Sequence, residues 1–193
     1  MLNKIIQIII FTNLVFLSTS SIASLRQYIA KVENSTWQLK DETRLQCTLS
    51  HLLPGYGEAS FSSIASKKLN MEFELDMIRL PNSYGVAAVY SVPPKWMPGQ
   101  VQRTIAEMAI RKQYNGDLPE QVAWTMLTEL EKGFWPTIYY QDEYNQYDKV
   151  AVGLNASNFA VSYERFAECV ANLLPYSFQD IAYTVLTYQF NNT

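Results

Sequence analysis

The feature that most constrains the fold of this sequence is a pair of cysteines, Cys47 and Cys169, near opposite ends of the 193-residue chain. The stretch RLQCTLS (44–50) alternates polar and apolar residues, which predicts a strand with Cys47 on its apolar face. Cys169 shares the i, i+3, i+4, i+7 spacing of one helix face with Phe166 and Leu173. Both sulfur atoms are therefore expected to point into the core.

The amino terminus has the pattern of an export leader. Lys4 precedes an apolar stretch at residues 5–17, and the small residues of SIA (21–23) match a signal-peptidase site. We expect residues 1–23 to be a signal peptide and residues 24–193 to form a single domain without a transmembrane segment. The alternative is an uncleaved N-terminal anchor, although the apolar stretch is shorter than the roughly 20 residues that span a bilayer.

In an oxidising compartment two inward-facing cysteines usually pair, which predicts a disulfide between Cys47 and Cys169. The alternative is that both remain buried as free thiols. A catalytic cysteine would need an adjacent base, and the only histidine, His51, is expected on the strand face opposite Cys47. Zinc needs three or four ligands at close spacing, so no metal site is predicted.

The remaining pattern contains more strands than helices. The stretch 69–77 alternates between an apolar and an acidic face, as antiparallel strands do. A helix is expected after Asp117, which forms a capping-box pattern with Glu120, and Gly133 should end it. Strands are also expected at 84–92, 134–140, 149–154 and 181–190, with 104–114 a strand or a helix and the Cys169 helix ending at Pro175. The predicted class is α+β, a mainly antiparallel, barrel-like sheet with two principal helices and one disulfide.

Signals of catalysis are missing from the sequence. It contains no glycine-rich phosphate loop, nucleophile elbow or His-Glu-x-x-His motif. The acidic pairs Asp142–Glu143 and Glu129–Glu131 are interpreted as solvated surface. A formal net charge of −3 without a basic cluster argues against nucleic-acid binding. We therefore expect a protein that is not an enzyme and that carries no cofactor.

Several stretches, taken in order, resemble the N-terminal domain of MotY-like proteins, periplasmic components of the sodium-driven polar flagellar motor. They are YGEASFSSIASKKLNMEFEL (56–75), PPKWMPG (93–99), ELEKGFWPTIYYQD (129–142) and ECVANLLPYSFQDIAYTVLTY (168–188). No single stretch is a catalytic motif, so the specificity of the resemblance comes from their number and order. Both cysteines match the pair of the family, and the resemblance implies that they are disulfide-bonded.

The resemblance implies a structural role in the periplasm. MotY-like proteins help to build the T ring around the flagellar basal body, where their N-terminal domain docks to the basal body and to MotX. The ring helps to assemble the stator units around the rotor. The alternative from a different class is a protein-binding adaptor module of another envelope complex on the same fold.

The sequence departs from the family in one respect. MotY-like proteins usually continue into an OmpA-like domain that binds peptidoglycan, whereas this sequence stops at YQFNNT (188–193). It is either a naturally short paralogue or a shortened record of a longer chain. On this reading we expect no direct binding to peptidoglycan, and docking to the basal body is unaffected.

The stretch SVPPKWMPGQ (91–100) is the candidate partner-binding loop. Pro93 and Pro94 restrict its conformation, and Trp96 and Met97 are large apolar residues without a periodic place in the core. Exposed aromatic side chains on rigid loops are common contact residues at interfaces. The alternative is that Trp96 packs down as a lid over one end of the sheet.

Overall fold

The computed structural model describes residues 24–65, 71–75, 86–109, 118–144 and 147–174. The leader expected over 1–23 and the strand expected over 181–190 lie outside the described residues. The described residues form nine strands, two α-helices and a short 3₁₀ turn (Val32–Asn34). The strands lie in two sheets, and one buried apolar cluster joins the inner faces of both sheets to the helices.

The first sheet has five strands in the order β1-β9-β8-β6-β7. Only the pairing of β1 with β9 is parallel, and the other pairs are antiparallel. Alternation places Ala87 and Val89 of β6 in the core, together with Ile138 of β8. The five strands are β1 (Leu25–Ile29), β6 (Val86–Val92), β7 (Arg103–Ala109), β8 (Trp135–Gln141) and β9 (Lys149–Gly153).

The second sheet has four antiparallel strands in the order β2-β3-β4-β5. Its inner face carries Phe61 and Phe73, whose rings pack 4.9 Å apart, while Glu72 and Glu74 of β5 point to solvent. The four strands are β2 (Trp37–Glu42), β3 (Gln46–Leu53), β4 (Gly57–Ile64) and β5 (Glu72–Leu75).

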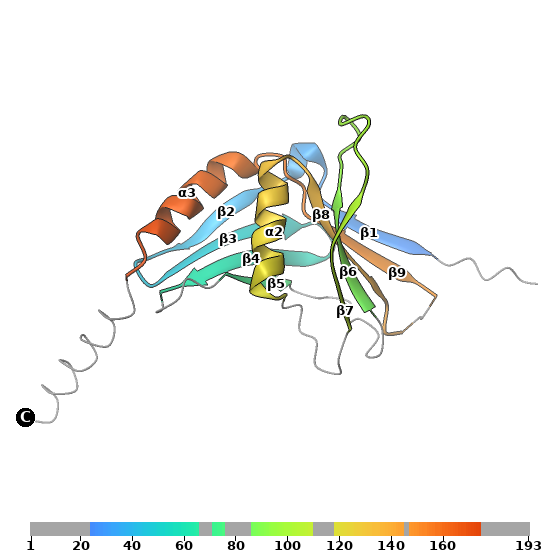
Figure 1. Cartoon of the computed structure of the whole chain (residues 1–193), viewed down its shortest axis with the longest axis horizontal. Coiled ribbons are helices and arrows are strands. Elements are labelled where there is room, and N and C mark those ends of the chain that lie inside the picture. The colour runs from blue at the N-terminus through green and yellow to red at the C-terminus, as the bar shows by residue number, and fades with distance from the viewer. Residues whose placement is uncertain (1–23, 66–70, 76–85, 110–117, 145–146, 175–193) are drawn as a thin grey trace, which may run out of the picture.

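The two helices cover different parts of the core (Figure 1). α3 (Phe159–Ala171) lies over β2 and β3, whereas α2 (Glu120–Glu131) contacts strands of both sheets. α2 buries Ala123, Met126 and Leu127 along one stripe, as its periodicity predicts. The α2 helix therefore bridges the two sheets, through contacts with β7 and β8 of the first sheet and with β5 of the second.

The predicted fold class is confirmed, since the chain is α+β with mostly antiparallel strands and one disulfide. The ambiguous stretch at 104–114 is a strand over its described part, β7. The helix start was predicted too early, because α2 begins at Glu120 with Pro119 as its N-cap; Asp117 lies outside the described residues. The helix end is confirmed: Gly133 has φ +83° and donates its N–H to the Leu130 carbonyl.

Candidate functional site

The disulfide that the sequence predicts joins β3 to α3. The sulfur atoms of Cys47 and Cys169 are 1.99 Å apart, and the Cα atoms are 6.0 Å apart across 122 positions of sequence. Cys47 is fully buried and Cys169 is 8% exposed. The free-thiol alternative is therefore wrong. The bond holds the amino-terminal and carboxyl-terminal parts of the described chain together under α3.

His51 lies on the same face of β3 as Cys47, so the prediction of opposite faces was wrong: four residues are two full periods of a strand. Its ring stacks on Trp37 at 4.4 Å, and Nδ1 is 2.9 Å from the Thr36 carbonyl oxygen. Burial lowers the pKa of His51, although the bond to Thr36 opposes this shift, so the ring is neutral. Its role is to fill the core.

The described residues bring together no group of three histidine, cysteine or acidic side chains that could hold a metal ion. The described part of the chain also contains no helix that is both long enough and apolar enough to cross a bilayer.

The candidate loop (91–100) begins in the last two residues of β6 and makes up most of the connection to β7, which projects as the tip of a hairpin beyond the first sheet (Figure 1). Pro94 is buried, and its carbonyl oxygen accepts the N–H of Met97 at 2.9 Å, which closes a turn. Gly99 has φ +81°, a conformation that side-chain-bearing residues rarely adopt. The loop is thus shaped by its own prolines, glycine and internal hydrogen bond.

Two large side chains fasten the loop to the start of β8. Trp96 packs its ring edge-on against Trp135 at 5.5 Å and still exposes 55% of its surface. Met97 lies over Gly133, where its Cε would be only 2.8 Å from an added Cβ atom. The indole nitrogen of Trp135 is buried and has no hydrogen-bond partner among the described residues. The Trp96 side chain therefore lies at the surface while resting on a second tryptophan.

A buried carboxylate fixes the base of the same loop. Glu129 of α2 accepts hydrogen bonds from the Ser91 hydroxyl, from Arg103 Nη2 at 2.8 Å and from Lys132 Nζ at 3.0 Å. Burial by itself raises the pKa of Glu129, but the bonds from Ser91 and Lys132 and the positive charges of Arg103 and Lys132 outweigh it. The pKa of Glu129 is consequently below its ordinary value of 4.5.

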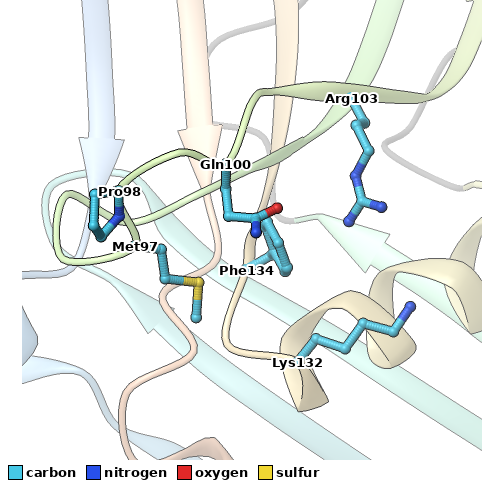
Figure 2. Close-up of a pocket in the computed structure, with 6 residues that line it drawn as sticks. All are labelled: Met97, Pro98, Gln100, Arg103, Lys132 and Phe134. Carbon is cyan, nitrogen blue, oxygen red and sulfur yellow. The ribbon is translucent and has the colours of Figure 1, made fainter.

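Two of these groups, Arg103 and Lys132, line an open pocket of about 540 Å³ together with residues of the loop (Figure 2). The Arg103 guanidinium lies 4.9 Å from the ring centroid of Phe134, and the Arg103 and Lys132 side chains are each about half exposed. The pocket therefore offers two positive charges beside an apolar wall. It is lined by Met97, Pro98, Gln100, Arg103, Lys132 and Phe134.

Sequence reasoning singled out the loop as a candidate, which stays a prediction, but did not name the residues beneath it. Pro93 and Pro94 carry the chain out of β6, and Trp96 and Met97 reach β8 and the end of α2. The interpretation of Glu129 and Asp142 as solvated surface was wrong, because they are only 6% and 2% exposed. The position of Glu129 within the apolar stripe of α2 was the available signal.

The fold defines a class, namely a disulfide-linked α+β domain of two sheets, with a projecting loop above an open pocket. The chain belongs to the MotY N-terminal domain family, whose model matches residues 28–175. It is 41% identical over 174 residues to the sodium-type flagellar protein MotY of Vibrio parahaemolyticus serotype O3:K6 (strain RIMD 2210633). The matched region is 90% of this chain and 59% of that protein, so the chain spans less than two thirds of its relative.

Proposed function

We propose that this chain is a structural component of the polar flagellar motor that works in the periplasm. It docks to the basal body as part of a T-ring-like assembly and helps stator units to assemble around the rotor, with a MotX-like protein as a partner. The observation that carries this proposal is the match to MotY over 90% of the chain. The disulfide and the leader pattern support an exported location, because such bonds persist in oxidising compartments.

The docking surface in this proposal is the candidate loop together with the pocket beneath it. Trp96 fits a contact residue because tryptophan is enriched among the residues that dominate binding energy, and over half of this side chain is exposed. The turn at Pro94 and the contacts with Trp135 and Gly133 hold the loop in one shape. A preformed loop loses little conformational entropy when it binds.

The charges of the pocket indicate the chemistry of the partner segment. Arg103 and Lys132 carry two positive charges against the single negative charge of Glu129, which leaves one unit of positive charge at the rim. Phe134 and Met97 supply apolar contact area. The surface therefore fits a partner segment in which an acidic side chain stands next to an apolar one.

The first test of this proposal is deletion of the gene in its motile host. We expect cells that assemble filaments but swim poorly, since a ring that holds stators acts after the filament is built. The swimming speed and the number of filaments per cell are the measurements. Normal swimming without a paralogue that compensates would contradict the motor role and favour the adaptor of another envelope complex.

The second test separates docking from folding. The deletion strain is complemented with Trp96→Ala and with Tyr144→Ala, a matched control that removes an 85% exposed aromatic ring beyond the opposite end of β8. We expect both proteins to accumulate to wild-type levels, and only Trp96→Ala to lose co-purification with basal bodies. If both variants co-purify with basal bodies equally, the loop is not the docking surface. This conclusion holds whether or not the gene deletion impairs swimming.

A further inference from the structure

The start of the described chain lies against a buried carboxylate. Ser24 donates its hydroxyl to Asp148 Oδ1 at 2.6 Å, and Arg26 Nη2 donates to Oδ2 at 3.1 Å. The Asp148 residue is only 7% exposed. The carbonyl oxygen of Ser24 accepts the N–H of Lys149 at 2.9 Å, which extends the β1–β9 pairing by one residue. Ser24 is thus held by its side chain and by its backbone.

The 2.6 Å contact between the Ser24 hydroxyl and Asp148 Oδ1 also brings the main-chain nitrogen of Ser24 close to the Asp148 carboxylate. The amide at this position therefore lies near a negative charge. Removal of a leader at residues 1–23 would hydrolyse the peptide bond before Ser24 and convert this amide into an α-ammonium group. A neutral N–H group would become a cation, and a hydrogen bond from it to the carboxylate would be charge-assisted.

We propose that Asp148 is the binding site for the α-ammonium group that leader removal creates on Ser24. The proposal rests on leader removal, which belongs to the proposed function. The Ser24 hydroxyl, more than the guanidinium of Arg26, keeps the pKa of Asp148 below its ordinary value, so the carboxylate is charged. The other charged residues on the elements around Asp148 are Arg26 on β1, Asp142 after β8 and Lys149 at the start of β9.

This contact would complete the attachment of β1 to the fold. Among the strands that the structure describes, β1 lies at the edge of its sheet and pairs only with β9, through five residue pairs. At its far end Tyr28 packs against Tyr56 at 5.0 Å, and Ile29 covers Gly153, where an added Cβ atom would be 2.7 Å from Ile29 Cγ1. An ammonium–carboxylate pair at Ser24 closes the open end of this strand. Export and folding are thereby coupled, because the pair forms only after the leader is removed.

The pair makes a measurable prediction about the amino group. A carboxylate in contact raises the pKa of an α-amine by about one unit above its usual value of about 8. The stability that the pair contributes is therefore present below about pH 8 and is lost as the pH rises through the raised value. An amine-reactive label attacks only the neutral amine, so the rate of N-terminal labelling reports this pKa.

The experiment uses the protein purified from the periplasm, with the label on the N-terminal peptide followed by mass spectrometry between pH 6 and 10. We expect Asp148→Asn to speed labelling about tenfold at pH 7.5, equivalent to one pKa unit. Arg26→Gln, the matched control, removes a competing cation and should not speed labelling. A third variant with Gly-Asn inserted before Ser24 moves the amine away from an intact Asp148, and it should label like Asp148→Asn.

The outcomes separate this inference from the leader prediction. A mature protein that starts at a residue other than Ser24 would overturn both. A mature protein that starts at Ser24 but labels at the same rate with and without Asp148 would overturn only the binding site. Equal labelling of the insertion variant and the wild type would overturn it as well, even if Asp148→Asn failed to fold.

Discussion

Removal of the disulfide should cost this domain a large share of its stability. The Cys47–Cys169 bond closes a loop of 122 positions. The chain-entropy relation for a loop of this length gives about 5 kcal/mol of stabilisation at 25 °C, and strain or residual structure in the unfolded chain lowers the measured value. Domains are typically stable by about 5–15 kcal/mol, so the full value of about 5 kcal/mol would be at least about a third of the total.

The perturbation is Cys47→Ala, Cys169→Ala and the double variant, compared by urea denaturation with the oxidised and the reduced wild-type protein. We expect losses of about 3–5 kcal/mol in each variant, with the double variant no worse than the single ones, because both substitutions remove one bond. The reduced wild-type protein separates the cross-link from side-chain packing, since it keeps both sulfur atoms. Thiol labelling of denatured, unreduced periplasmic protein should find no reactive cysteine.

Two results would refute this reasoning. The first is a loss below about 1 kcal/mol on reduction, which would mean that the unfolded chain is not constrained by the long loop. The second is additive losses in the double variant, which would mean that the two side chains act separately rather than through a shared bond.

Three further predictions concern the loop and its base. Glu129→Gln should lower the free energy of unfolding at pH 7 by only about 1–2 kcal/mol, because the Arg103 and Lys132 side chains are half exposed and water screens their charges. The pKa of Glu129 is below 4.5 in the folded protein, so the stability advantage of the wild type should shrink as the pH falls below that value. Denaturation between pH 3 and 7 measures this change. Gly133→Ala should lower stability by about 1–2 kcal/mol, because φ is +83° and Met97 occupies the space, and an unchanged thermal midpoint would contradict this. Trp96→Ala should shift the midpoint of urea denaturation by less than Trp135→Ala, since Trp96 is 55% exposed, and an equal loss would favour the lid.

Local patterns in the sequence were sufficient to predict most of the elements. The end of α2 at Gly133 was predicted because glycine adopts a positive φ without steric cost. The orientation of Cys47 and Cys169 followed from strand and helix periods, and the pairing followed from the compartment that the leader indicates. The loop with Trp96 was predicted because two prolines and an unplaced tryptophan are visible without any tertiary information.

The tertiary structure decided what surrounds that loop. The place of Glu129 in the apolar stripe of α2 indicated burial but not its partners, which β6 and β7 supply as Ser91 and Arg103 from positions 38 and 26 residues away. The parallel pairing of β1 with β9, which places Ser24 beside Asp148 across 124 positions, likewise has no local signature. Periodicity depends on the chain next to each residue and can be read in sequence. By contrast, the residues that pair with a buried charge, and the strand that pairs with an edge strand, come from distant parts of the sequence. Only the folded chain determines which distant segments meet.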